Sequence, residues 1–249
     1  EGARNIGVTP KEKYERDAEV LLKALEEEPN NDRYVFYLAQ SYFDSQQWEK
    51  SLEAYEKRAK MGGWREEVYY SLLRCAILKG VMEKPFLEIA DAFLASHDAK
   101  PDRAEPLWFL SRLYRNANRP ATAYLYAKMA ADIPYPADDI LFIQDDVYRW
   151  GILDEISATA FYAGKAEIGF AATRHLIENN LVPREHMERV HNNYNSYKTV
   201  LEEMNKGKVE KKIKDQVEKK QKKVEKINKE KKSTKAPVKQ GYKKRKQKV

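Results

Sequence analysis

The sequence predicts an all-α fold in which helical hairpins stack into a right-handed α-solenoid. Apolar residues recur at intervals of three and four through most of the chain, which is the period of an amphipathic helix. Short polar, glycine or proline turns separate these patterns, and no stretch alternates as a strand would. The pattern also repeats, because Leu38, Leu72, Leu110 and Ile156 hold equivalent places in successive helices, 34, 38 and 46 residues apart.

The stretch from Asn31 to Trp64 contains the clearest copy of the repeating unit. One helix is expected over 33–43 and a second over 48–61, with a polar turn between them. Gly62-Gly63 ends the second helix, because glycine enters the left-handed conformation without a Cβ penalty. A two-helix unit with a period near 34 residues is typical of tetratricopeptide arrays, in which each hairpin buries its apolar face against its neighbours.

The other elements follow from start and stop signals. Thr9, Pro10 and Glu12 form a capping box that begins a first helix, which Pro29 ends and which we expect to cap the solenoid. Asp102 is expected to cap the third hairpin. The remaining hairpins are predicted at 65–79 with 84–96, 103–116 with 121–132, and 147–162 with 165–179, and a closing helix at 184–205.

Small residues recur in the second helix of a hairpin, where it must approach the first. These residues are Ser51, Ala123 and Gly169.

A proline-rich, acidic insert, Ile133–Trp150, precedes the fourth hairpin. Its four aspartates could hold a hard cation through oxygen ligands, or could cap helices and solvate a connection. Its aromatic rings could stack on a sugar, grip a peptide or pack in the core. The aspartates are Asp138, Asp139, Asp145 and Asp146, and the aromatic residues are Tyr135, Phe142, Tyr148 and Trp150.

Composition divides the chain into a linker at 1–8, a repeat domain at 9–204 and a basic low-complexity tail at 205–249. The net charge of +7 hides this division, since residues 205–249 hold 20 Lys/Arg and 5 Asp/Glu. The tail therefore carries +15 and the remainder of the chain −8. An acidic folded body with a basic appendage is predicted.

The tail has a narrow apolar stripe from Val209 to Ile227, which is too thin to hold a helix by packing, and its composition after Ser233 predicts disorder. Its lysines would neutralise phosphates in nucleic acid or another polyanion, bind a membrane surface or acidic protein, or simply remain solvated. The candidate polyanion-binding residues are Lys219, Lys220, Lys222, Lys223, Lys243, Lys244, Arg245 and Lys246.

Signs of catalysis are absent from the sequence. Cys75 lies among apolar residues in mid-helix, as a small buried hydrophobe would, and it excludes an internal disulfide. His186 and His191 are not spaced to share a helix face, and no glycine-rich phosphate loop or nucleophile elbow occurs. No apolar stretch is long enough to span a bilayer, and cysteine usage favours a reducing, cytoplasmic location.

Partner binding is expected on the concave face, where solenoids present the first helix of each hairpin. The candidate residues for a protein or glycan acceptor are Tyr34, Tyr37, Trp108, Tyr135, Asp138, Asp139, Tyr148 and Trp150.

Four segments resemble the tetratricopeptide region that follows the catalytic domain in certain bacterial and viral family 2, GT-A-type glycosyltransferases. They are NNDRYVFYLAQSYFD, YEKRAKMGGWREEVYYSLL, AEPLWFLSRLYR and IPYPADDILFIQDDVYRWGILDE, and the resemblance covers about Tyr14–Asn192. It implies an upstream catalytic domain that uses a nucleotide-sugar and a divalent metal through an Asp-x-Asp motif. No such motif occurs in this chain, so no catalytic residue is carried over.

Three functional hypotheses remain at this point. The first is a non-catalytic module of a glycosyltransferase, which binds an acceptor or partner protein or mediates homo-oligomerisation; the start at Glu1 rather than Met agrees with a fragment. The second is a free-standing tetratricopeptide scaffold whose tail binds RNA or another polyanion. The third, an enzyme in its own right, requires nucleotide-sugar turnover that we do not expect.

Overall fold

The computed structural model describes the backbone of residues 9–233, and their side chains except those of Val209 and 224–233. This part of the chain contains helices and no strand, and it separates into two units, Glu1–Lys198 and Thr199–Val249. The helices are α1 (Pro10–Glu27), α2 (Asp32–Asp44), α3 (Trp48–Met61), α4 (Arg65–Val81), α5 (Phe86–Ala99), α6 (Glu105–Asn116), α7 (Pro120–Ala131), the π-helix η2 (Val147–Gly151), α8 (Ile152–Thr159), the 3₁₀-helix η3 (Ala160–Ala163), α9 (Ala166–Glu178) and α10 (Arg184–Ser233).

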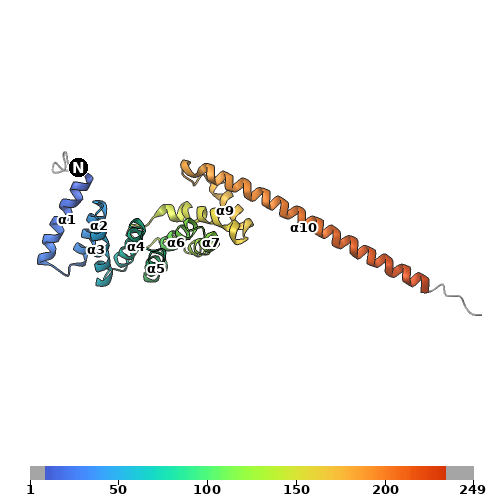
Figure 1. Ribbon diagram of the computed structural model, residues 1–249, viewed down its shortest axis with the longest axis horizontal. Helices are drawn as coiled ribbons and strands as arrows, with labels where there is room; N and C mark the ends of the chain where they lie inside the picture. The colour runs from blue at the N-terminus through green and yellow to red at the C-terminus, as the bar shows by residue number, and fades with distance from the viewer. Residues whose placement is uncertain (1–8, 234–249) are drawn as a thin grey trace, which may run out of the picture. The chain divides into compact units, whose positions relative to one another are not determined.

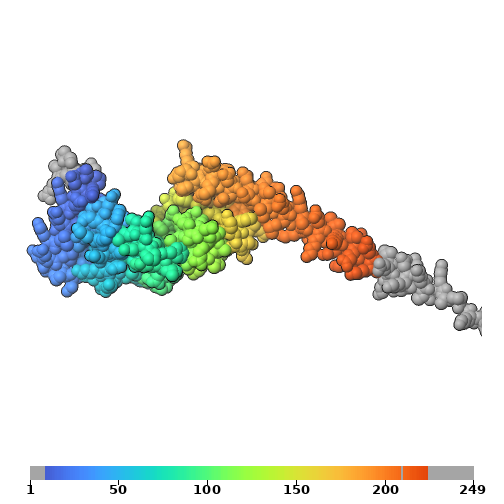
Figure 2. Space-filling model, viewed as in Figure 1, coloured from blue at the N-terminus to red at the C-terminus, as the bar shows by residue number. Residues whose placement is uncertain are grey.

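The first unit is the predicted solenoid. Each helix from α1 to α9 packs mainly on its neighbours in the chain, and Figure 1 shows the antiparallel pairs following one another. Figure 2 shows the same order as contiguous bands of side chains. The all-α hairpin architecture and its order are therefore confirmed.

The predicted equivalent positions are buried in the first, third and fourth hairpins, and the buried position is displaced by one residue in the second hairpin. Leu38, Leu110 and Ile156 are buried as predicted, but in α4 the buried leucine is Leu73 at 0% exposure, and Leu72 is only half-buried. One residue turns a helix by about 100°. The glycine turn before α4 sets the phase of that helix, and a constant period does not capture this.

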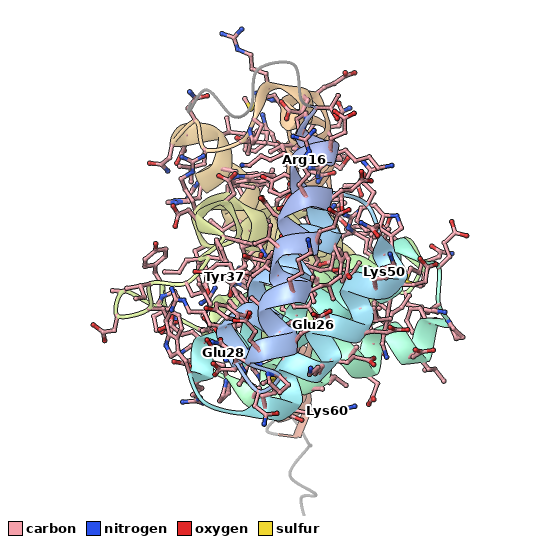
Figure 3. All side chains as sticks on the ribbon, turned by 90° about the vertical axis from the view of Figure 1, so that its left-hand side faces the viewer. Arg16, Glu26, Glu28, Tyr37, Lys50 and Lys60 are labelled. Atoms are coloured by element: carbon pink, nitrogen blue, oxygen red, sulfur yellow. The ribbon has the colours of Figure 1, made fainter. Side chains whose placement is uncertain are left out.

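Helix α1 ends the array as predicted. The Thr9 hydroxyl accepts a hydrogen bond from the Glu12 amide, and the Glu12 carboxylate accepts one from the Thr9 amide, which completes the capping box. Figure 3 looks onto this end, where Arg16 and Glu26 lie along α1. Ala18 of α1 is buried against the array, whereas Leu22 is 45% exposed.

The prediction that small residues let the second helix of a hairpin approach the first is confirmed at Ser51, whereas Gly169 makes room for a different helix, α10. The buried Ser51 hydroxyl donates to the carbonyl oxygen of Ala39, 2.8 Å away on the facing helix. A Cβ on Gly169 would lie 2.2 Å from the Tyr197 hydroxyl, so that ring occupies the space a larger residue would need. The Tyr197 hydroxyl in turn donates to the carbonyl of Ser157, 2.8 Å away. Gly169 thus lets α10 pack into the groove between α8 and α9.

The first helix of the fourth hairpin is not the single helix predicted. It begins as the π-helix η2, continues as α8 and ends as the 3₁₀-helix η3. A π-turn widens the helix by one residue and often occurs at functional sites.

The second unit departs from the prediction of an unstructured tail. Helix α10 continues beyond the expected end at Asn205 to Ser233. Ile213 and Val217 on its apolar stripe are 56% and 47% exposed, so no packing within the described residues holds them. Lysine and glutamate are good helix formers, and propensity over this long run was underestimated. The predicted disorder after Ser233 lies outside the described residues.

None of the described helices is both long and apolar enough to cross a membrane.

Candidate functional site

The insert between α7 and η2 folds back across the preceding hairpins and is fixed by a buried ionic cluster. The Arg103 guanidinium is fully buried and donates to the Glu105 carboxylate at 2.6 Å and to Asp139 Oδ2 at 3.0 Å. Two carbonyls of the insert, those of Leu141 and Phe142, accept from the same guanidinium. An arginine can satisfy this many acceptors because it has five donors in a planar fork.

Two tyrosines complete the cluster around Glu105. The hydroxyls of Tyr148 and Tyr69 donate to Glu105 Oε2, at 2.7 Å and 3.2 Å. Burial and the neighbouring Glu105 carboxylate raise the pKa of both phenols above the usual value. The two hydroxyls therefore remain neutral donors, and the carboxylate is fully partnered.

The insert also reaches the second hairpin. Glu66 on α4 accepts hydrogen bonds from the backbone amides of Ile140 and Leu141, at 3.0 Å and 2.7 Å. The Phe142 ring lies 4.7 Å from that of Tyr70, centroid to centroid. These contacts anchor a segment that has no regular structure of its own.

Several residues predicted for the site have structural roles instead. Asp139 pairs with Lys100 and Arg103, and Tyr148 belongs to the Glu105 cluster, so neither is available to a partner. Asp102 pairs with Lys100 at 2.8 Å, while Ala104 occupies the cap position of α6. Sequence spacing could not show the roles of Asp139 and Tyr148, because Arg103 and Glu105 lie 36 and 43 residues before them.

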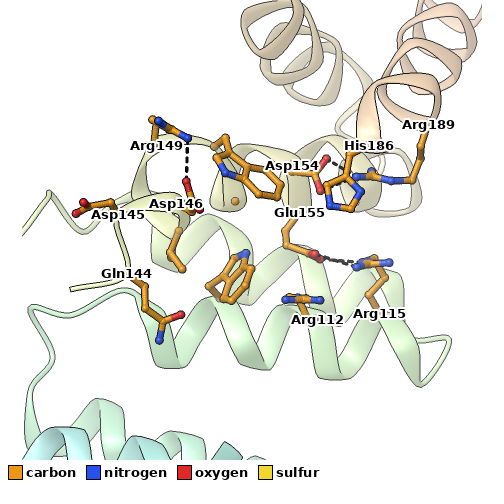
Figure 4. A pocket seen from close by; sticks show the side chains of 14 residues that line it. Arg112, Arg115, Gln144, Asp145, Asp146, Arg149, Asp154, Glu155, His186 and Arg189 are labelled. Carbon is orange, nitrogen blue, oxygen red and sulfur yellow. Dashed lines mark hydrogen bonds and ion pairs between the residues drawn. The ribbon is translucent and has the colours of Figure 1, made fainter. Parts of the chain in front are cut away.

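A pocket of about 700 Å³ lies beside the anchored insert. Helix α6, the end of the insert, η2, α8 and the first turns of α10 line it, all within the first unit. It contains two predicted residues, Trp108 and Trp150, and we call it the tryptophan pocket (Figure 4). The structure therefore brings together two rings that are far apart in the sequence.

Ion pairs join the helices around the tryptophan pocket. Arg115 binds Glu155 through two hydrogen bonds of 2.8 Å and 2.9 Å, and this carboxylate raises the pKa of the guanidinium. Arg189 on α10 binds both oxygens of Asp154, at 2.9 Å and 2.8 Å. The bidentate Arg115–Glu155 pair holds α6 onto α8. The Arg189–Asp154 pair, which uses one guanidinium nitrogen, holds α10 onto α8, and together the two pairs fix the pocket walls.

Each tryptophan ring of the pocket contacts the side chain of a basic residue. The Arg112 guanidinium is 4.6 Å from the centre of the Trp108 ring, within cation–π range. The His186 ring is 5.6 Å from that of Trp150. Gly151 of the π-helix provides the room for Trp108, since a Cβ there would lie 3.0 Å from its Nε1 atom. The absence of a side chain at Gly151 thus leaves space for the Trp108 ring.

The other predicted residues are scattered. Tyr34 and Tyr37 line a separate hollow of about 410 Å³ between α1 and α2, and Arg33 donates to the Tyr37 hydroxyl. Tyr135 and Asp138 are exposed on the insert.

The aspartates of the insert do not converge as cation ligands would. Asp139 lies in the ionic cluster, Asp145 accepts from the Tyr135 hydroxyl at 2.7 Å, and Asp146 pairs with Arg149 at 2.9 Å. Within the part of the chain that the structure describes, no three His, Cys, Asp or Glu side chains form a group suited to a metal. Cys75 is buried, and burial raises the pKa of its thiol to about 12, so it is a packing residue.

The predicted polyanion-binding lysines lie on the second unit. Lys219, Lys220, Lys222 and Lys223 are exposed on α10, and Lys222 pairs with Glu218. The remaining candidates, Lys243, Lys244, Arg245 and Lys246, lie outside the described residues.

The sequence did not point to the charged walls of the pocket. Arg115 and Glu155 are 40 residues apart, and Arg189 and Asp154 are 35 apart, so no local motif joins them. The available signal was that Arg112 and Arg115 lie one and two turns after Trp108 on the same face of α6.

Comparisons with known proteins support the fold. No family model and no curated protein matches the chain. The crystal structure of MamA matches with a TM-score of 0.50 and 14% sequence identity, over 70% of this chain and 95% of that chain. MamA is a tetratricopeptide-like helical repeat protein, and at this identity the likeness concerns the fold.

Proposed function

We propose that this chain is a non-catalytic interaction module, whose solenoid binds a partner protein through the tryptophan pocket. The observation that carries the proposal is the pocket itself, an open cavity walled by paired charges and two indole rings. Binding energy concentrates on tryptophan, tyrosine and arginine in pockets of this kind. The tetratricopeptide-like fold is the architecture in which such surfaces are expected.

The finer part of the proposal places the module in a glycosyltransferase. The resemblance of residues 14–192 to the helical region of family 2 enzymes supports it, and the bound species would then be the acceptor, a glycan or protein, or another subunit. Nucleotide-sugar and divalent metal would belong to a separate catalytic domain. Sequencing the source DNA upstream of Glu1 tests this: an α/β segment with an Asp-x-Asp motif is expected, and a start codon there would contradict it. Nucleotide-sugar turnover by the purified chain would also contradict the non-catalytic role.

Site-specific photo-crosslinking in the source cells tests the interaction role. Arg149 at the pocket rim, whose side chain is 62% exposed, would be replaced by a photoreactive phenylalanine in the intact chain. Lys128 on α7, outside the pocket lining and 46% exposed, provides the matched control. A discrete adduct from position 149 and none from 128 is expected. No adduct, or equal adducts at both positions, would reject the pocket as the partner site.

A second candidate function is polyanion binding by the second unit. The exposed lysines of α10 favour it, since an ordered cationic helix presents charges without a folding cost on binding. RNA binding should weaken steeply with salt and vanish when 206–249 are deleted. Binding that survives the deletion would reject it.

A further inference from the structure

The two ends of the tryptophan pocket each hold charges of both signs, but their net charges are opposite. In Figure 4, Gln144, Asp145, Asp146 and Arg149 gather at one end, while Arg112, Arg115, His186 and Arg189 lie toward the other, with Asp154 and Glu155. Three ion pairs neutralise most of these groups: Arg115 with Glu155, Arg189 with Asp154, and Arg149 with Asp146.

One charge of each sign is left over. Arg112 forms no ion pair with any side chain that the structure describes, and its guanidinium lies on Trp108. At the other end Asp145 forms no ion pair in the described part of the chain, and it accepts one hydrogen bond from the Tyr135 hydroxyl. Both side chains are exposed, so both can be reached by a ligand.

We infer that the tryptophan pocket takes a dipolar peptide segment of a partner protein. An acidic side chain of the peptide pairs with Arg112, a basic side chain pairs with Asp145, and the residues between them lie against the tryptophans. The three internal ion pairs keep the remaining charges occupied, so that only these two positions select the ligand. This rests on the proposed function and specifies its partner.

Charge complementarity favours this occupant over the alternatives. A neutral glycan would leave Arg112 and Asp145 without counter-charges, although it could stack on the rings. A polyanion such as nucleic acid would meet Asp145 and Asp146 at one end, and like charges brought together in an interface are unfavourable. A segment with one charge of each sign satisfies both ends.

Selection from a displayed library of random dodecapeptides on the intact chain tests the inference. Enriched sequences should contain an acidic and a basic residue separated by apolar residues. Arg112→Glu should weaken the selected peptides about tenfold, and Asp145→Lys similarly, because each turns an attraction into a repulsion. Peptides with the corresponding charge reversed should recover binding to each variant. Lys128→Glu on α7, outside the pocket, is the matched control and should change nothing.

The outcomes separate this inference from the function on which it rests. Peptides whose affinity is the same for all variants, or which carry charge of one sign, would overturn the dipolar site while leaving a peptide-binding module. Enrichment of no peptide, together with a photo-adduct at position 149, would overturn it in favour of a glycan or a folded surface. If no peptide is enriched and no photo-adduct forms at position 149, the pocket is rejected as a partner site. Unchanged thermal unfolding of Arg112→Glu and Asp145→Lys is expected, since both side chains are exposed.

Discussion

The hairpin array and the helical segment Thr199–Ser233 are both rich in charged residues, but they hold those charges differently. In the array, Arg58 is fully buried against Glu67 and the carbonyl of Gly62, at 2.9 Å and 2.7 Å. In the segment, Lys222 and Glu218 form an exposed pair one turn apart. Buried charges are costly to leave alone, whereas exposed pairs contribute little. The stability of the array therefore depends on each buried charge keeping its partner, whereas the helical segment depends on the helix propensity of its residues.

The largest effect should come from placing a charge in the array core. Leu73→Asp should lower the free energy of unfolding by about 4 kcal/mol or more, because the carboxylate would be buried without a partner. Leu72→Asp is the matched control, and its half-buried side chain should cost less than half of that. Chemical denaturation of both variants checks the register of α4, and equal losses would refute it.

Breaking the ionic cluster should have the next largest effect. Arg103→Ala leaves Glu105 buried without its cation and removes one of the two cations paired with Asp139, and about 3 kcal/mol of stability should be lost. The exposed counterpart, Lys222→Ala, should change stability by about 0.3 kcal/mol at most. Urea unfolding gives both values. Similar losses in the two variants would remove the distinction between buried and exposed charges.

Filling the space beside Gly169 should have a smaller effect. Gly169→Ala would displace the Tyr197 ring from the groove, at a cost of about 1–2 kcal/mol after the gain in helix propensity. In a Tyr197→Ala background the same substitution should be neutral or stabilising. A double-mutant cycle measures the coupling between the two positions. If the two losses are additive, the cost of Gly169→Ala does not arise from a clash with the Tyr197 ring.

Alkaline pH should destabilise the array gradually. The phenols of Tyr69 and Tyr148 have pKa values raised above 10.0 in the fold, so above pH 10.0 the unfolded chain releases protons that the folded chain retains. The contribution of the two neutral phenols to the free energy of unfolding is therefore fully present below pH 10.0 and is lost as the pH rises above it. Melting temperature between about pH 9 and pH 11 follows the effect. Tyr148→Phe should have a shallower decline, and an identical slope would contradict the assignment.

The smallest effect is expected from removing the basic segment. Deleting residues 206–249 should leave the melting transition of the array unchanged, because the described side chains of this segment are exposed. Circular dichroism would lose helical signal without a shift in the cooperative transition. A clear drop in melting temperature would mean that the segment packs on the array.

The parts of the fold that local patterns encode were predictable. The capping box at Thr9, the glycine turn after Met61 and the buried Leu110 follow from spacing and backbone preference. The helical structure of residues 206–233 was not predictable in this way, because the apolar stripe is too thin to indicate a packed helix and only helix propensity favours one.

The candidate site was predictable only in part. Trp108 and Trp150 could be selected as aromatic residues, but the arginines and carboxylates that wall their pocket pair over 35 and 40 residues. The π-helix η2 beside Trp108 depends on one extra residue per turn, for which hydrophobic periodicity has no signal.

The fold-back of the insert has a consequence for how the molecule is made. A tandem array whose units touch only their neighbours can unzip from either end. Here the amide of Leu141 is bound to Glu66, 75 positions earlier in the chain. During synthesis the second hairpin therefore gains these hydrogen bonds only after the insert, which leaves the ribosome later, has been made. Once the insert is bound, α4 and α6 are expected to unfold together, so that the second and third hairpins behave as one cooperative unit within the array.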